Sequence, residues 1–434
     1  MRVRMTLAVL ILSAVVARGE DWPQWMGPKR DNVIRETGLV EKFPEGGPKV
    51  LWRKPIKSGY AGPAVVKGKV YISDYATADK TKDGNFDRDP TKGTEMVMCL
   101  DAANGEVIWK HSYAAEYRIS YPSGPRCTPT VHEGKVYFLG AIGHLLCCDA
   151  EKGDILWQKD LTAEYKTKPA MWGYAGHPLI DGQKLLTLAG GDGSHVVALD
   201  KDTGKEIWKS QSQTEQGYVP PSIIEAGGVR QLLVPGPKAV RALDPETGKR
   251  LWSVDYEASS GSIVMTPIKS GNLLYVAGYS NKNLLLQLST EKPEAVELWR
   301  DKRNVLSPVN VQPFLEGEVL YGFDQGGELR AIELPSGKQL WTSTAPLVED
   351  KAFSNGTAFM YKNGDRFFLF NDQGEIIICK LSPAGYEEIS RSKPLLELTA
   401  NSFGRKVVWC APAFADKKMF VRNDKEIICV DLAK

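Results

Sequence analysis

The chain has only one long apolar run, and its charges show no excess of either sign. The run, Leu7 to Val16, spans 10 residues, whereas a helix needs roughly 20 apolar residues to cross a bilayer. No other segment approaches that length, so we expect no membrane span. The 55 basic and 53 acidic residues give a formal net charge of +2, which offers no electrostatic reason to expect binding to nucleic acid.

The N-terminus has the three parts of a secretory signal peptide. Arg2 and Arg4 precede the apolar run, and Ala17-Arg18-Gly19 supplies small residues for cleavage. We therefore predict a signal peptide over residues 1–19 and export to the periplasm or the extracellular space. Its removal takes away three arginines and lowers the formal net charge to −1. No cysteine precedes Cys99, so we expect no lipid anchor.

The sequence also lacks the common catalytic and metal-binding motifs. The five histidines do not have the spacing of a zinc site. There is no GxSxG, Walker or HExxH sequence. Seven is an odd number of cysteines, so at least one thiol stays free or pairs between molecules. No motif therefore assigns a reaction.

What the sequence does contain is a repeat of 42 to 51 residues. One phrase joins an Asp, a Gly-containing turn and a Trp strand, as in LDKDTGKEIW ending at Trp208. A second phrase, usually a Pro followed by a short apolar strand, precedes it and occurs eight times, as in PAVVKGKVYIS from Pro63. Short alternating strands between Gly turns indicate antiparallel sheet, and this period is typical of a solenoid, a propeller or an array. We predict one four-stranded blade for each repeat.

The last repeat is incomplete, and the missing strand lies at the other end of the chain. The copy that begins at Pro412 has no Trp strand, while residues 48–55 (PKVLWRKP) supply a Trp52 strand without a blade. Pairing the two closes a ring and removes two exposed sheet edges. The sequence therefore predicts an all-β fold, an eight-bladed β-propeller of four-stranded antiparallel blades over residues 48–434. The N-terminal strand closes the ring, and a leader over residues 20–47 precedes it.

Seven of the eleven tryptophans occupy the repeat position, and we predict that their rings pack between neighbouring blades. They are Trp52, Trp109, Trp157, Trp208, Trp252, Trp299 and Trp341. In the seventh repeat, LSPAGYEEI, we expect Ile389 at this position. The Asp and Gly of the phrase are assigned to the turn, where Gly permits a positive φ.

These phrases resemble the pyrroloquinoline-quinone-like (PQQ-like) repeat family, which includes quinoprotein alcohol dehydrogenases and the outer-membrane assembly protein BamB. The resemblance covers essentially the whole chain after residue 19. The leader DWPQW (Asp21 to Trp25) and the stretch WGYAGHP (Trp172 to Pro178) also look similar to segments of exported bacterial propellers. The resemblance implies the fold strongly and the function weakly.

The resemblance makes the Cys147-Cys148 pair a candidate, since quinoprotein alcohol dehydrogenases hold a vicinal disulfide beneath the cofactor. Here the pair lies in LLCCDAEKG, within the third strand of a blade, rather than near an inner strand. Other repeats have alanine at the position of Cys147, as at Ala198 and Ala242, so we expect a small buried side chain there. No motif assigns Glu, Asn and Asp to a calcium ion. No cofactor is therefore predicted, and PQQ with calcium stays the alternative.

An insertion in the first repeat is rich in acidic residues. It stretches the interval from Pro63 to Trp109 to 46 residues, against 28 from Pro129 to Trp157. Oxygen ligands of the kind that calcium takes recur at alternate positions, namely Asp83, Asn85, Asp87 and Asp89. The loop departs from the EF-hand pattern, with Arg88 in place of Gly and Thr94 in place of Glu. A metal site and a solvated loop both stay open, and we expect folding not to require calcium.

The connections between blades differ in length, and the longest enter blades two, three and eight. Tight turns such as VKGK occupy one face, so we expect recognition on the opposite face, over blades eight, one, two and three. Aromatic, Arg and His side chains suited to binding collect there: Tyr60, Tyr121, Arg126, Trp172, Tyr174, His177, Arg405 and Trp409. The alternative is that these loops fold their aromatic rings into the channel wall.

Together these features predict an exported, monomeric propeller of the cell envelope that binds an unknown protein or small-molecule ligand on one face. We expect binding or scaffolding without catalysis. The alternative is a PQQ-dependent alcohol dehydrogenase-type oxidoreductase, and a hydrolase or lyase without a recognisable motif is a third reading.

Overall fold

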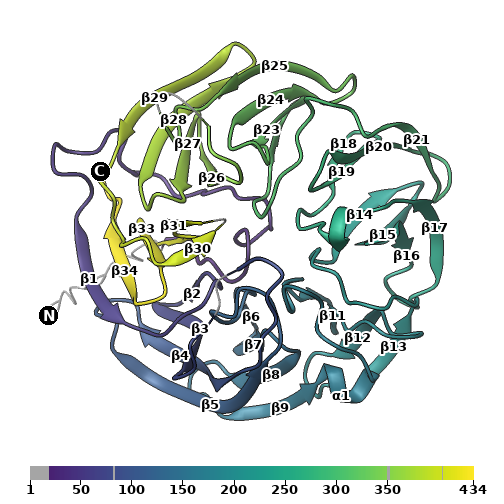
Figure 1. Ribbon diagram of the computed structural model, residues 1–434, viewed down its shortest axis with the longest axis horizontal. Helices are drawn as coiled ribbons and strands as arrows, with labels where there is room; N and C mark the ends of the chain where they lie inside the picture. Colours follow the sequence, from purple (N-terminus) through teal and green to yellow (C-terminus); the bar gives the residue numbers. More distant parts are fainter. Residues whose placement is uncertain (1–18, 82–83, 349–351, 403) are drawn as a thin grey trace, which may run out of the picture.

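The computed structural model describes residues 19–434, apart from residues 82–83, 349–351 and 403. Residues 1–18, which hold nearly all of the predicted signal peptide, lie outside the described part. Eight four-stranded antiparallel sheets are arranged as a ring around a central channel (Figure 1). The predicted eight-bladed propeller is therefore confirmed. Among the described residues, no helix is long and apolar enough to cross a membrane.

Seven blades are formed by four consecutive strands each, and the eighth combines both ends of the chain. The strands of blades one to four are β2 (Ala64–Val66), β3 (Lys69–Thr77), β4 (Thr91–Asp101), β5 (Val107–Tyr117); β6 (Thr130–His132), β7 (Lys135–Leu139), β8 (His144–Asp149), β9 (Ile155–Asp160); β10 (Leu179–Asp181), β11 (Lys184–Leu188), β12 (Val196–Asp200), β13 (Glu206–Ser210); β14 (Ser222–Ala226), β15 (Val229–Gly236), β16 (Ala239–Leu243) and β17 (Arg250–Asp255). The strands of blades five to eight are β18 (Ile268–Ser270), β19 (Leu273–Gly278), β20 (Lys282–Leu288), β21 (Ala295–Arg300); β22 (Phe314–Glu316), β23 (Val319–Phe323), β24 (Leu329–Glu333), β25 (Lys338–Ser343); β26 (Ala358–Asn363), β27 (Arg366–Asn371), β28 (Ile376–Ser382), β29 (Gly385–Arg391); β32 (Ala413–Ala415), β33 (Lys418–Arg422), β34 (Glu426–Asp431) and β1 (Val50–Pro55).

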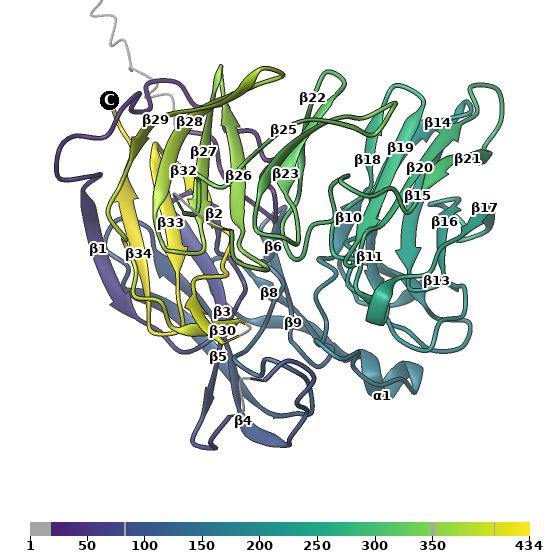
Figure 2. The same cartoon turned by 45° about the horizontal axis from the view of Figure 1, so that its top comes forward.

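Three short elements lie between blades. They are the helix α1 (Leu161–Tyr165), the 3-10 turn η1 (Ser259–Gly261) and the hairpin of β30 (Ala400–Ser402) with β31 (Arg405–Val407). The β4–β5 hairpin of blade one is longer than its counterparts and extends beyond the face of the ring (Figure 2). The insertion between β3 and β4 belongs to this extension.

Neighbouring blades cover both faces of the middle strands. All five residues of β11 are buried, whereas the outer strand β13 of the same blade is exposed or half-buried throughout. A strand buried on both faces reads as a continuous apolar run, while a half-exposed strand alternates. This explains why runs such as Leu185 to Leu188 precede alternating Trp strands.

Strand β1 closes the ring, as the incomplete last repeat predicts. It pairs antiparallel with β34, with Trp52 opposite Cys429. Leu39 of the leader also bridges to Ala433. The first and last residues of the propeller therefore share one sheet, so that blade eight has no open edge where the chain ends meet.

Five outer-strand tryptophans hydrogen-bond to the following blade, and we call this contact the lock. Trp109 lies on β5 of blade one. Its Nε1 atom donates to the carbonyl of Ala150 in blade two, in the turn between β8 and β9, over 3.2 Å. Trp157 donates in the same way to Lys201 of blade three over 3.0 Å. Trp52, Trp299 and Trp341 repeat the contact with the following blade, at Ala102, Pro335 and Ser382. Trp252 instead donates to Gln231 of its own blade.

The third strand usually has a small residue beside this contact. Tyr71, Cys99 and Trp109 lie side by side across blade one, and the centroids of the two rings are 6.1 Å apart. The Tyr71 hydroxyl reaches the Ala150 carbonyl as well, over 3.1 Å. Blade five has Leu285 at the same place, and its two rings are also 6.1 Å apart, so the ring spacing does not depend on a small residue.

All seven cysteines are buried and free. Cys147 and Cys148 belong to different apolar clusters, because successive residues of a strand point to opposite faces. Burial raises the pKa of both thiols to about 12. Both cysteines therefore pack as small protonated residues in the core.

The seventh blade corrects one prediction. In every Trp blade the tryptophan lies opposite the residue just before a register shift, as Trp109 lies opposite Cys99. In blade seven that place belongs to Ser390, which lies opposite Ile378. Ile389 is therefore not the counterpart of the tryptophan, as the sequence alignment suggests, but of the apolar residue before it. The Ser390 hydroxyl accepts a hydrogen bond from the backbone N–H of Phe43, in the leader, over 3.0 Å.

The leader fills the channel at the end where the tight turns lie. Trp22 and Val65 exchange two backbone hydrogen bonds of 2.7 and 2.8 Å next to the β2–β3 turn. Two blades away around the ring, in blade seven, Lys362 donates to the Asn32 carbonyl and accepts from Ile34 next to the β26–β27 turn. The purple N-terminal segment accordingly lies in the centre of the ring (Figure 1). The channel is therefore plugged at one end.

Removal of residues 20–56 should expose the edge of β34 and take the plug from the channel. We expect a lower melting temperature and aggregation, because an unpaired edge invites association between chains. Removal of residues 20–47 alone is the control, since it leaves β1 in place and should not cause aggregation. Thermal denaturation with light scattering measures both, and an unchanged melting temperature after the longer deletion would contradict ring closure by β1.

Alanine at Gly153 should weaken the lock between blades one and two. An added Cβ would lie 2.5 Å from the Trp109 ring, at a residue whose φ is +82°. Gly134 of the same blade is the matched control, because its φ is +75° and a Cβ there meets nothing within 4 Å. We expect Gly153→Ala to lower the free energy of unfolding by roughly 1–3 kcal/mol more than Gly134→Ala, as overpacking does. Equal losses in denaturant titrations would show that the ring contact contributes little.

Candidate functional site

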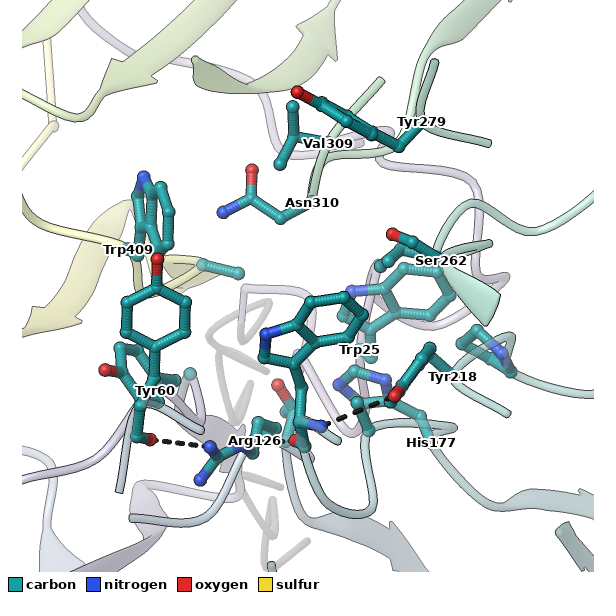
Figure 3. A pocket seen from close by; sticks show the side chains of 18 of the residues that line it. Trp25, Tyr60, Arg126, His177, Tyr218, Ser262, Tyr279, Val309, Asn310 and Trp409 are labelled. Carbon is teal, nitrogen blue, oxygen red and sulfur yellow. Dashed lines mark hydrogen bonds between the residues drawn. The ribbon is translucent and has the colours of Figure 1, made fainter. Parts of the chain in front are cut away.

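A cavity of about 330 Å³ opens at the end of the channel opposite the plug, where the connections between blades lie. We call it the channel cavity. Figure 3 shows its side chains pointing inward from all around the ring. Its lining consists of Trp25, Tyr60, Gly62, Asn85, Phe86, Tyr121, Arg126, Thr128, Trp172, Ala175, His177, Tyr218, Pro220, Ser259, Ser260, Ser262, Val264, Tyr279, Val309, Asn310, Phe359, Trp409 and Ala411.

One position of the repeat supplies a lining residue from seven of the eight blades. It is the third residue before the proline that precedes the innermost strand. The residues at this position are Tyr60, Arg126, Ala175, Tyr218, Val264, Asn310 and Trp409. Blade seven has no proline there and contributes Phe359 from β26 instead. The chemistry of the wall is therefore set mainly by single residues at one repeat position.

Aromatic rings form most of the wall, in two groups. On one side, the Trp172 ring lies 5.4 Å from Tyr218 and 5.7 Å from Phe86, tilted against both. On the other side, Tyr121 meets Trp409 edge to face at 6.2 Å. Phe86 is 53% exposed, which places it at the rim.

The leader supplies the floor. The Trp25 ring stacks on His177 with centroids 4.7 Å apart and an angle of 18°, and the Arg30 guanidinium lies 5.7 Å from the same indole. Burial, followed by the positive charge of Arg30, lowers the pKa of His177 to about 3. The imidazole is therefore neutral at physiological pH and provides a flat surface rather than a charge.

Arg126 brings a positive charge to the wall but uses most of its donors internally. Its guanidinium donates to the carbonyls of Trp172 over 2.9 Å, Ser120 over 2.9 Å and Tyr121 over 2.6 Å, and also to that of Gly124. It also lies over the Tyr60 ring at 5.2 Å. Burial lowers its pKa. Arg126 therefore ties the loops that enter blades two and three together.

The structure brings six of the eight predicted binding residues to the channel cavity. These are Tyr60, Tyr121, Arg126, Trp172, His177 and Trp409. Tyr174 is buried elsewhere, where its hydroxyl donates to the Ala189 carbonyl over 3.0 Å. Arg405 pairs with buried Asp372 over 2.6 Å and lies over the Phe353 ring. Neither of these two lines the cavity.

Sequence reasoning missed four notable lining residues. Trp25 belongs to the leader, for which the sequence predicts no binding role. The other three, Tyr218, Tyr279 and Asn310, lie in blades four to six, outside the predicted arc of blades eight, one, two and three. All eight blades contribute, so the cavity belongs to the channel rather than to an arc. The repeat position three residues before the proline would have identified Tyr218 and Asn310, whereas nothing in the sequence places Trp25 in the channel.

One residue of the acidic insertion supports the wall of the channel cavity. Asn85 accepts a hydrogen bond from Trp172 Nε1 over 2.9 Å, so its side chain supports the wall. Asp83 lies outside the described residues. In the part of the chain that the structure describes, no group of three or more His, Cys, Asp or Glu side chains could hold a metal ion, and Asp87 and Asp89 form no such group.

The cavity offers a poor donor set for PQQ with calcium. Calcium takes six to eight oxygen ligands, usually with carboxylates among them, and no Asp or Glu is among the residues that line the cavity. Cys147 and Cys148 lie in the core of the blades rather than in the channel. The wall also pairs no nucleophile with a base, because the neutral His177 stacks on Trp25. The lining that the structure describes therefore supplies no carboxylate for a calcium ion.

Comparisons with known proteins agree with the fold. BamB from Moraxella catarrhalis is 15% identical, with 87% of this chain and 96% of that chain covered and a TM-score of 0.54. The quinohemoprotein alcohol dehydrogenase ADHIIG from Pseudomonas putida HK5 is 12% identical, with 95% and 80% covered and a TM-score of 0.59. A computationally designed protein, Ika8, is 10% identical, with 88% and 99% covered and a TM-score of 0.54. Such low identities show the fold alone.

The comparison with curated protein sequences gives no match. A family profile, described as outer membrane protein assembly factor BamB, matches residues 93–229 and 237–433. These two segments make up most of the chain, from the third strand of blade one to the last strand of the sequence, β34. The chain therefore belongs to the BamB family of PQQ-like repeat propellers.

Proposed function

We propose that this protein is an exported, non-enzymatic binding protein of the cell envelope that holds a flat ligand in the channel cavity. The observation that carries the proposal is a pocket closed at its base by Trp25 and walled by aromatic rings from around the propeller. Most small-molecule sites are concave and largely apolar with a few placed polar groups, and this cavity has that composition. The ligand is a small molecule or a flat side chain of a partner protein.

The charges around the cavity favour a neutral or anionic ligand. Aromatic walls alone attract cations. Here Arg126 lies against Tyr60, and Arg30 lies behind Trp25, so two guanidinium groups already occupy the ring faces. No carboxylate is among the lining residues to offset them. A cation would therefore meet like charges in a desolvated site, which costs free energy.

The aromatic lining favours a flat conjugated molecule over a polyol. Asn85 is engaged by Trp172 and Arg126 by backbone carbonyls. The other polar side chains of the wall include Asn310, Thr128, three serines and four tyrosines, and each tyrosine hydroxyl is carried on a flat ring. Figure 3 shows the Asn310 side chain projecting into the space between Trp409 and Trp25. A buried hydroxyl without a partner costs roughly 1–3 kcal/mol. A sugar with many hydroxyls would therefore lose more hydrogen bonds to water than it could make with this wall.

Two features support the location in the envelope. The N-terminus has the pattern of a signal peptide, and the description of the family refers to the outer membrane. A scaffold role through protein contacts fits the same family, and a partner's aromatic side chain could enter the cavity. We propose the single propeller over residues 48–434 as the binding unit, as a monomer.

A charge series of flat probes tests this function. We expect the purified protein to bind 2-naphthoate and 2-naphthol, and to bind 2-naphthylmethylammonium at least roughly tenfold more weakly, a difference of about 1.4 kcal/mol. Trp172→Ala should weaken the first two, while Val296→Ala, which changes a 60% exposed residue of the outer strand β21, should not. Isothermal titration calorimetry gives the affinities. Preference for the cation, or no effect of Trp172→Ala, would sink the proposal.

Chelation separates this function from a calcium-dependent one. We expect excess EDTA to leave both the melting temperature and naphthoate binding unchanged, because no carboxylate lines the cavity. Re-addition of calcium with PQQ is the matched control and should add no dye reduction in the presence of alcohols. A large loss of thermal stability on chelation would instead make Asp87, Asp89 and the rest of the insertion candidate ligands.

A further inference from the structure

Trp25 separates the channel cavity from a second, smaller cavity of about 20 Å³. Both cavities are lined by Trp25, Val264, Asn310, Phe359 and Ala411. The smaller one continues toward the plugged end, where Asn32 of the leader and Tyr361 of β26 close it. A space of this size holds about one water molecule, so a ligand in the channel cavity ends at the Trp25 indole.

The indole is held in place by its neighbours and by the leader behind it. Its stack on His177 fixes one face (Figure 3). Met26, which follows it, accepts backbone hydrogen bonds from Asp31 and from Asn32 over 3.2 and 3.0 Å, which closes a tight loop. Before it, Pro23 accepts a backbone hydrogen bond from Val131 over 2.8 Å.

Both ends of that loop are anchored in the propeller. Trp22 is 2% exposed and packs edge to face on Tyr361 and Phe414, with centroids 5.7 and 5.6 Å away. At the other end, Asn363 donates to the carbonyls of Ile34 and Glu36, over 2.8 Å each. A loop fixed at both ends by blades one, two, seven and eight holds Trp25 as part of the wall rather than as a loose tail.

We propose that Trp25 is a specificity-determining residue that sets how long a flat ligand the channel cavity accepts. This inference rests on the proposed function and adds a residue from outside the propeller to the binding site. Replacement of the indole by a methyl group would join the two cavities and deepen the site along the channel. The leader would then close the base of the site, and the size of the side chain at residue 25 would limit the length of the ligand that fits.

Two probes that differ only in length test the proposal. 2-Naphthoate and anthracene-2-carboxylate carry the same carboxylate on two and three fused rings. We expect the wild-type protein to prefer naphthoate and Trp25→Ala to shift the affinity ratio toward the anthracene probe by roughly tenfold or more, as pocket size does for one extra apolar group. Phe86→Ala, at the rim, is the matched control and should weaken both probes alike.

The outcomes separate the two proposals. If both probes bind the wild type and Trp25→Ala leaves their ratio unchanged, the role of Trp25 is refuted and the proposed function stands. If neither probe binds the wild type, the proposed function fails and this inference fails with it. Because Trp25→Ala removes the stack on His177, Trp25→Phe is the second variant, which keeps a ring and should shift the ratio in the same direction by less. Thermal denaturation shows that each variant is folded.

Discussion

The contact between an outer-strand tryptophan and the turn of the following blade carries the connection around the ring. Each blade is a separate sheet. Backbone hydrogen bonds between neighbouring blades lie in the connections and turns, as between Tyr60 and Pro125. At the outer edge the tryptophan side chain combines apolar burial with a directed hydrogen bond, as Trp109 does at Ala150. The glycine of the turn follows from this contact, because an added Cβ at Gly153 would lie 2.5 Å from the Trp109 ring. The positions that look most repetitive in the sequence are those that the lock needs.

Because the lock lies at the outer edge, the inner edge of the ring is free to vary. The residues three before the repeat proline range from Tyr60 and Trp409 through Arg126 and Asn310 to Ala175. These side chains form much of the wall of the channel, and Arg126 also joins the loops that enter blades two and three. The same scaffold can therefore hold quite different chemistry in its centre, which is the physical reason why fold and function separate so readily in propellers.

This difference between the outer and the inner edge of the ring decides what could be predicted from the sequence. The ring, its number of blades and its closure by β1 follow from the repeat and its missing strand, because a propeller has only one arrangement in which that strand finds a partner. Six of the predicted residues line the channel cavity, most of them on the longest connections, whereas Tyr174, one residue from the lining Ala175, is buried elsewhere. Tyr218 lies on a connection that is not among the longest, so loop length does not single it out. The alignment error at Ile389 arose because the bulge before the tryptophan shifts the register by one residue, which repeat letters alone do not reveal.

Trp25 lies beyond such reasoning altogether, because the leader has no counterpart in the repeat. Its place depends on pairing between Trp22 and Val65 and between Asn32 and Lys362, contacts that join segments about 40 and 330 residues apart. In a channel open at both ends a bound ligand would stay in contact with water at both ends, so binding would remove less apolar surface from solvent. A plug changes this balance, since ligand binding then releases water from a blind, mostly apolar space and brings the ring faces out of contact with solvent. The residues at the inner edge of the ring vary because the tryptophan contacts lie at the outer edge. The leader closes one end of the channel that these residues line, and so gives the site a defined base.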